Sequence, residues 1–203
     1  TTNTTTAPTR IDVNFSVKER PSGNLILGLG YAQSSGILFN ASVSQNNFLG
    51  TGKRMSVNFN NSRYNTIYSF NYTNPYYTID GISRGFGAYF RETDAGEANI
   101  GDYNVDTFGG NLSHSIPINE YDSVRLNVEF EHLELSETVF SPLVVSDFIN
   151  SQGDTFDTLK LTGGWSHDTR NRAIFADRGM LQSLSAEIAV PGMDLQYYKI
   201  NYR

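Results

Sequence analysis

The chain alternates large apolar residues with small or polar residues, in run after run separated by polar turns. In the clearest run, Val124 to Phe130, every second residue is apolar and the residues between them are Arg125, Asn127 and Glu129. A period of two residues is typical of a β-strand with one apolar face, and the spacing of an amphipathic helix fits almost nowhere. The sequence therefore predicts an all-β protein built from antiparallel hairpins.

Several runs have the length of strands that cross a membrane. A tilted membrane-spanning strand needs about 9–11 residues, whereas strands of soluble sheets are commonly about 5–6 residues long. Compact turns follow most even-numbered strands, and longer polar stretches, Glu92–Asp106 and Leu133–Asp157, follow odd-numbered ones, as in outer-membrane barrels. Two connections are exceptions: the one after the eighth strand, His167–Arg178, is long, and the QSSG turn after the first strand is short. A short run, Ile11–Val17, precedes the ten expected strands, which are Asn24–Gln33, Ile37–Gln45, Arg54–Asn60, Ile67–Asn74, Ile82–Arg91, Thr107–Ile116, Val124–Glu131, Thr158–Ser166, Ser183–Val190 and Gln196–Arg203. We expect an antiparallel transmembrane β-barrel.

The composition excludes several classes of function. The 203 residues carry a net charge of −6 with acids and bases dispersed, which gives no basic surface for nucleic acid. Cysteine is absent, so neither a disulfide framework nor a thiolate metal site can form. No apolar run approaches 18 residues, so we expect no transmembrane helix.

No catalytic constellation emerges from the motifs. His114 and His132 fall on apolar faces near strand ends, where we expect satisfied or interfacial side chains. Residues 166–170, SHDTR, bring Ser, His and Asp together, but neighbours on a turn lack the convergent geometry of a triad. Residues 28–30 lack the helix and lysine of a phosphate loop, and residues 154–158 have too few ligands for calcium. We expect no enzyme activity, no cofactor and no metal; an outer-membrane hydrolase stays open as an alternative.

Five segments carry a resemblance to a known family: "VKERPSG" before "LGLGYAQSSGILFNASVSQNNFLGTGKR", then "YTNPYYTIDGISRGF", "PINEYDSVRL" and "RGMLQSLSAEIAVPGMDLQYYK". In this order, from about Asp12 to Arg203, the chain resembles the BamA family of Gram-negative outer-membrane β-barrel assembly factors, in the POTRA-barrel superfamily. The resemblance implies that residues 1–23 are the end of the last periplasmic POTRA domain and its junction. Residues 24–203 would be the N-terminal part of a sixteen-stranded barrel, which is incomplete here, so we expect a fragment.

The family also implies a function. Its members fold and insert β-barrel proteins into the bacterial outer membrane, and their N-terminal side lies in the periplasm. The first barrel strand forms one side of a lateral gate and pairs with a strand of the client by β-augmentation. The predicted pairing edge comprises Asn24, Leu25, Ile26, Leu27, Gly28, Leu29 and Gly30. The predicted POTRA–barrel junction comprises Lys18, Glu19, Arg20, Pro21, Ser22 and Gly23.

Gly28 and Gly30 have two interpretations. Strand glycines weaken and soften a strand, which would leave a backbone edge that pairs without regard to side-chain identity. Alternatively, they relieve crowding inside a curved barrel. Residues 83–86, SRGF, imitate the family's Arg-Gly-Phe loop motif but lie inside an expected strand, so that role is not transferred to them.

The implied partners are outer-membrane protein clients, accessory lipoproteins of the assembly machinery, the lipid bilayer and lipopolysaccharide, and periplasmic chaperones, without nucleic acid. Two alternatives stay open besides the hydrolase. One is a two-partner-type secretion pore of the same superfamily, and the other is a stand-alone outer-membrane porin or adhesin.

Overall fold

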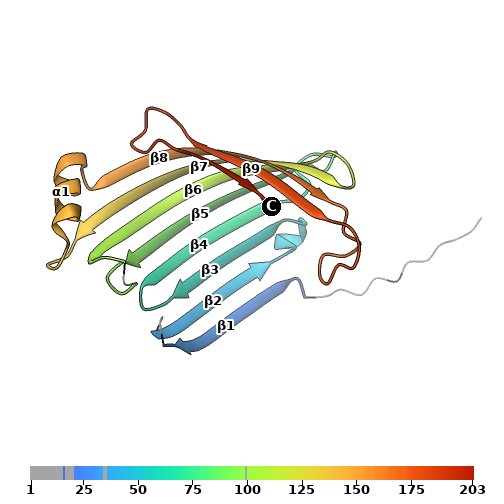
Figure 1. The fold of residues 1–203 in the computed structure, drawn as a ribbon. Coiled ribbons are helices and arrows are strands. Elements are labelled where there is room, and N and C mark those ends of the chain that lie inside the picture. The colour runs from blue at the N-terminus through green and yellow to red at the C-terminus, as the bar shows by residue number, and fades with distance from the viewer. Residues whose placement is uncertain (1–15, 17–20, 34–35, 99) are drawn as a thin grey trace, which may run out of the picture.

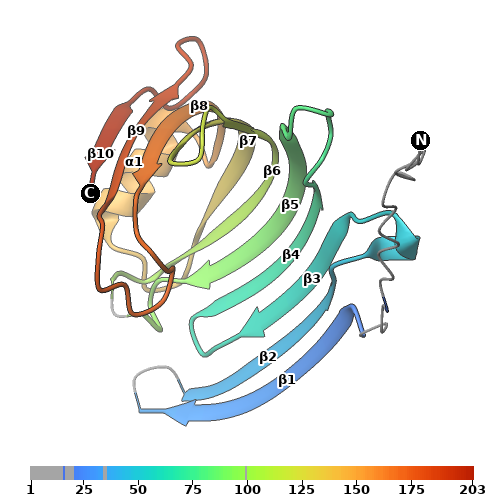
Figure 2. The same cartoon turned by 90° about the vertical axis from the view of Figure 1, so that its right-hand side faces the viewer.

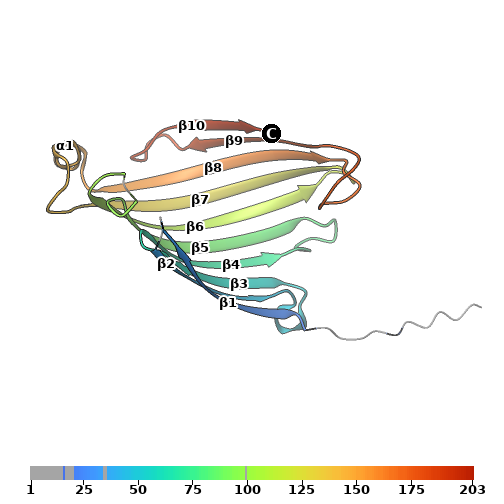
Figure 3. The same ribbon diagram turned by 60° about the horizontal axis from the view of Figure 1, so that its bottom comes forward.

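Ten strands form one antiparallel sheet in the order of the sequence (Figures 1 and 3). This computed structural model describes residues 16, 21–33, 36–98 and 100–203, so most of the expected run Ile11–Val17 lies outside the described residues. The strands are β1 (Gly23–Ala32), β2 (Gly36–Gln45), β3 (Arg54–Asn61), β4 (Asn65–Asn74), β5 (Ser83–Asp94), β6 (Tyr103–Pro117), β7 (Asp122–Glu137), β8 (Thr155–Asp168), β9 (Leu181–Ala189) and β10 (Tyr198–Tyr202). The all-β, antiparallel prediction is confirmed.

The sheet is strongly curved, and its two edges do not meet to close a barrel (Figure 2). Each strand pairs with its neighbours in sequence, and β1 and β10 form the two edges. A three-residue 3₁₀ turn, η1 (Phe48–Gly50), lies between β2 and β3. An open sheet of ten strands is the expected form of an incomplete barrel.

The two faces of the sheet differ in polarity and in crowding. One face carries apolar side chains that stay exposed, such as Leu126 at 49% and Leu161 at 44%. The other face carries polar side chains that are buried, such as Thr107 at 5% and Thr158 at 1%. Side chains converge on the concave face of a curved sheet, so the polar face is the concave, luminal one. The apolar face is the outer one, as lipid contact requires.

The strands are tilted relative to the apolar band. On β1 the outward apolar residues run from Leu25 to Tyr31, and on β7 they run from Val124 to Phe130. Following the register across the sheet, Leu25 lies in line with Phe130, so the start of one run faces the end of the other. The apolar band is therefore displaced by about one residue from each strand to the next. This displacement is about 3.3 Å along the strand for a spacing of about 4.8 Å between strands, which gives a strand tilt of about 35°. Transmembrane barrels have tilts in this range.

One helix was not expected from the sequence. The segment Leu133–Asp157 was expected to be a polar loop, but it holds the end of β7, the helix α1 (Leu143–Gln152) and the start of β8. Pro142 occupies the N-cap position, and Gly153, at φ +93°, ends the helix. Phe148 stacks on Phe156 with ring centroids 5.6 Å apart, which attaches the helix to the sheet.

The central strands also extend further than the alternation suggested. β5 ends at Asp94 and β6 begins at Tyr103, both inside the expected loop Glu92–Asp106. On β7, Leu133 and Leu135 lie on the polar face, where the alternation of the membrane segment breaks down. Outside the bilayer, backbone pairing maintains a strand without one apolar face. In the described part of the chain, no helix has the length and apolar character needed to cross a membrane.

Candidate functional site: the open edge of β1

The predicted pairing segment, residues 24–30, lies entirely within β1, at one edge of the sheet. β1 pairs with β2 over its full length, and among the described strands none pairs with its other side. The exposed fractions of Leu27 and Leu29 are 67% and 80%, whereas Leu126 and Leu184, which face outward between paired strands, expose 49% and 44%. The missing neighbour accounts for this difference.

The hydrogen-bond pattern divides the predicted segment into two sets. Asn46 N donates to Ser22 O at 2.8 Å, and this pair directly continues the β1–β2 register. Hydrogen-bonded and non-hydrogen-bonded pairs alternate along an antiparallel ladder. The backbone groups of Asn24, Ile26, Gly28 and Gly30 therefore bond to β2. Those of Leu25, Leu27 and Leu29 point toward the open edge.

The glycines of β1 are not required by crowding in this sheet. A Cβ atom added to Gly28 would lie 3.7 Å from Asn40 Cβ, and one added to Gly30 would lie 3.7 Å from Leu38 Cβ. These are ordinary van der Waals distances. By contrast, a Cβ atom on Gly109 would lie 2.7 Å from the Tyr89 ring. Among the described residues, crowding therefore does not explain Gly28 and Gly30.

The predicted junction is only partly described. Lys18, Glu19 and Arg20 lie outside the described residues. Pro21 is exposed, and Ser22 accepts the backbone hydrogen bond that precedes β1. Gly23 is the first residue of β1, so the strand begins one residue earlier than expected.

A polar network crosses the luminal face from β5 to β8. The Tyr89 hydroxyl lies 2.6 Å from Glu131 Oε2 and 3.0 Å from Glu129 Oε1, and Lys160 Nζ lies 2.7 Å from Glu131 Oε1. Tyr89 reaches these carboxylates over Gly109, whose lack of a side chain leaves the space. Charged side chains on the luminal face of β7 need water or polar partners, and Tyr89 and Lys160 supply part of that need.

Tyr197 extends this polar network of the luminal face beyond β9. Its hydroxyl donates to Glu187 Oε1 at 3.0 Å, and its carbonyl accepts from Ala189 N at 2.9 Å.

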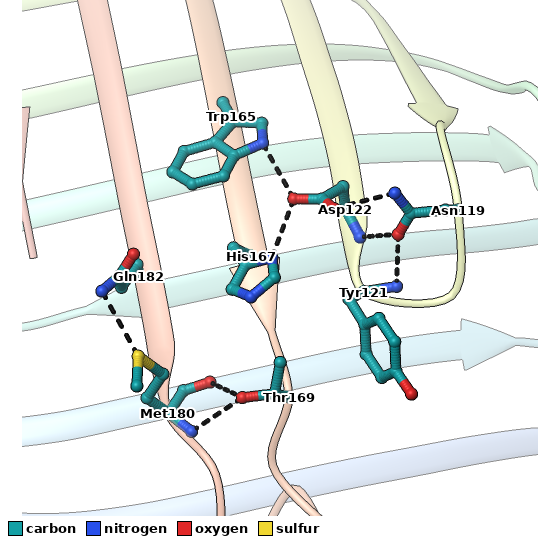
Figure 4. A network of polar contacts seen from close by, with 8 residues as sticks. All are labelled: Asn119, Tyr121, Asp122, Trp165, His167, Thr169, Met180 and Gln182. Carbon is teal, nitrogen blue, oxygen red and sulfur yellow. Dashed lines mark hydrogen bonds and ion pairs between the residues drawn. The ribbon is translucent and has the colours of Figure 1, made fainter.

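A second cluster lies on the outer face at the rim where the turns after even-numbered strands lie (Figure 4). Asp122 Oδ1 accepts from His167 Nδ1 at 2.9 Å and from Trp165 Nε1 at 3.1 Å. Asn119 Nδ2 donates to Asp122 Oδ2 at 2.8 Å. Ser166 lies on the opposite face from His167, because neighbours in a strand alternate. Residues 166–170 therefore do not form a triad.

The other two histidines also lie on the outer face near its margins, as expected. His132 Nδ1 lies 2.6 Å from Asp157 Oδ1 on the neighbouring strand. The His114 ring meets the Tyr77 ring edge-on at 6.3 Å. Within the residues that the structure describes, no group of three or more histidine or acidic residues could hold a metal ion.

Comparisons with known proteins agree with this geometry. The chain is 35% identical over 205 residues to the outer membrane protein assembly factor BamA of Neisseria meningitidis serogroup B, covering 96% of this chain and 26% of that protein. It is 26% identical over 123 residues to BamA of Buchnera aphidicola, covering 61% of this chain and 20% of the relative. The chain thus spans about a quarter of the length of these relatives or less. The family resemblance predicted from the sequence is confirmed.

A solved structure shares the fold. The crystal structure of BamA from Haemophilus ducreyi lacking POTRA domains 1–3 matches with a TM-score of 0.72 and 27% identity, covering 91% of this chain and 37% of that one. The Omp85 superfamily domain matches residues 47–203, which include β3 to β10. A continuous match over most of the sheet, together with the matching barrel geometry, shows the family. The chain belongs to the Omp85 superfamily.

Proposed function

We propose that the protein folds and inserts β-barrel proteins into the bacterial outer membrane, and that a client strand pairs with the open edge of β1. The chain is an outer-membrane protein, as its BamA relatives are. The observation that carries the pairing proposal is the alternation along β1, which turns the backbone groups of Leu25, Leu27 and Leu29 away from β2. In this proposal, the N-terminal side of the chain lies in the periplasm.

The chemistry of this edge suits many different clients. Main-chain N–H and C=O groups are the same in every client, so pairing through them does not depend on sequence. Unsatisfied backbone groups are costly in lipid, where no water can replace the missing hydrogen bond. Both the β1 edge and the edge of an incoming strand are therefore stabilised when they meet. No nucleotide and no catalytic group take part in this step, so the proposed role is not enzymatic.

The two faces of β1 support the same proposal. Its leucines keep the outer face apolar, so the strand stays compatible with lipid while its edge is exposed. Gly28 and Gly30 carry no side chain on the luminal face, which lets the strand bend away from or toward β2 with little resistance. A pliable first strand in this position can act as one side of a lateral gate.

The proposed partners follow from this role. They are outer-membrane protein clients, periplasmic chaperones that deliver them, and accessory lipoproteins of the assembly machinery. The bilayer and lipopolysaccharide surround the apolar face. Residues 1–23 are proposed to be the end of a POTRA domain and its junction with the barrel.

Site-specific crosslinking tests the pairing directly. Leu27→Cys in the full-length protein would be combined with single cysteines along the last strand of a client during assembly. We expect a disulfide with one register of client positions, because paired strands hold opposite residues at bonding distance. The matched control is Leu126→Cys, which faces outward from a strand with neighbours on both sides.

The outcome separates the candidate functions. Absence of any Leu27→Cys crosslink during productive assembly, with a second client contact detected as a positive control, would contradict the pairing. Crosslinks confined to luminal cysteines, together with conductance that depends on cargo, would instead support a secretion pore.

A further inference from the structure

Arg84 is an exception among the cations of the sheet. The described strands carry six arginine or lysine side chains, and five of them lie on the luminal face: Arg54, Arg91, Arg125, Lys160 and Lys199. Arg84 lies on the outer face instead, two residues before Phe86. A cation on the lipid-facing side of a barrel strand is destabilising unless it lies near an interface.

The position of Arg84 is the margin of the apolar band. Next to it, Phe86 stacks on Tyr72 with ring centroids 4.6 Å apart, and Leu112 lies opposite Phe86 on β6. Arg84 and His114 follow as the next outward pair toward the rim, directly opposite each other in the register. Arg84 is therefore the residue of β5 at which the outward apolar run Phe86–Phe90 ends on the rim side.

The turn between β4 and β5 holds this guanidinium in place. Arg84 Cζ lies 3.9 Å from the centroid of the Tyr77 ring, within cation–π distance. The turn itself is fixed, because Tyr77 N donates to Ile82 O at 2.9 Å and Gly81 N donates to Thr78 O at 3.2 Å. The planar fork of Arg84 is therefore oriented before any ligand arrives.

Arg84 has no acidic partner in the described part of the chain within 4.0 Å. Arg170, at the same rim, differs from Arg84 because it has an acidic partner. Its Nη2 atom lies 2.7 Å from Asp168 Oδ2. A guanidinium matches the oxygens of a phosphate in a two-pronged geometry that an ammonium cannot reproduce. His114 adds a ring nitrogen that can donate a further hydrogen bond.

We propose that Arg84, oriented by Tyr77 and assisted by His114, binds the phosphate of a phospholipid headgroup at this rim. The acyl chains of that lipid lie over Phe86 and Leu112. The choice of phospholipid rests on the proposed orientation, in which this rim lies in the periplasmic leaflet and lipopolysaccharide occupies the other one.

Lipid titration followed by native mass spectrometry tests the site. The full-length protein in detergent would be titrated with phosphatidylglycerol, and Arg84→Gln would be compared with Arg125→Gln, which removes a luminal arginine. We expect Arg84→Gln to weaken binding of the tightest lipid about tenfold and Arg125→Gln to leave it unchanged. Tyr77→Leu should weaken binding several-fold, whereas Tyr77→Phe, which keeps the ring, should not.

Each remaining outcome decides the proposal. Equal lipid binding by the wild type and Arg84→Gln would overturn it, and so would equal losses in Arg84→Gln and Arg125→Gln. Displacement of phosphatidylglycerol from this site by lipid A at equal concentration would overturn the assignment to phospholipid. If Arg84→Gln lost the heat-modifiable fold, Arg84→Lys would replace it, with weaker binding expected because the fork is lost. Client crosslinking at Leu27→Cys is independent of all these results.

Discussion

Leu27 lies opposite Ala41 in the β1–β2 register, in a pair whose backbone hydrogen-bonding groups point away from each other. Because side chains and backbone groups alternate with the same period, the residue that turns its side chain to lipid also turns its N–H and C=O to the open edge. The lipid-facing leucines of β1 are therefore also the residues that can pair with another strand.

Gly28→Ala should stiffen β1 without disturbing its packing. The added methyl group fits at an ordinary distance from Asn40, and replacing a strand glycine by alanine stabilises by about 0.5–1 kcal/mol. We expect stronger protection of β1 amides in hydrogen exchange and slower client assembly. The control is Gly163→Ala on β8, where nothing lies within 4 Å of the new methyl group. A stiffened β1 that assembles clients at the wild-type rate would show that pliability is not needed.

Gly109→Ala should break the luminal network. Its methyl group would lie 2.7 Å from the Tyr89 ring, so Tyr89 would have to leave Glu131 and Glu129. Overpacking of this kind lowers the free energy of unfolding by about 1–3 kcal/mol. Urea unfolding of the full-length protein measures this loss, and Gly163→Ala, which adds the same methyl group to a strand without a close contact, is the matched control. An unchanged urea midpoint for Gly109→Ala would mean that Tyr89 makes no important contact.

Adjacent cysteines on β7 should report opposite environments. Leu126→Cys faces lipid, so a membrane-impermeant maleimide should not label it in intact outer membrane. Asn127→Cys faces the lumen and should be labelled through the water there. Labelling after detergent solubilisation controls for reactivity, because both thiols should then react. Equal labelling of the two cysteines in the membrane would contradict the assignment of the faces.

The sequence predicted most of the strands because membrane strands must alternate. From Val124 to Phe130, each residue faces either lipid or water, so the period is visible without a structure. Helix α1 lies outside the bilayer, where that constraint ends. Its boundary signals, Pro142 and Gly153, are visible in the sequence.

Other features could not be predicted from the sequence, because they depend on the register in which the strands pair. Tyr89 is forty residues from Glu129, and only the pairing of β5, β6 and β7 brings them together over Gly109. The same holds for the candidate site. The segment 24–30 could be selected from the sequence, but its division into edge-facing and β2-facing backbone groups depends on the Ser22–Asn46 hydrogen bond.

The most direct test removes a single donor from the open edge. Leu27→Pro deletes an N–H that β2 does not use, and an edge strand tolerates proline at such a position. Leu27→Val is the matched control, because it shortens the side chain and keeps the N–H. Client assembly would be measured in liposomes that contain the full-length protein and its accessory subunits, alongside the heat-modifiable mobility of the barrel.

We predict that Leu27→Pro keeps a folded barrel and loses at least about tenfold in the initial rate of client assembly, corresponding to about 1.4 kcal/mol, while Leu27→Val assembles clients at nearly the wild-type rate. A folded Leu27→Pro barrel that assembles clients at the wild-type rate would contradict pairing at the β1 edge.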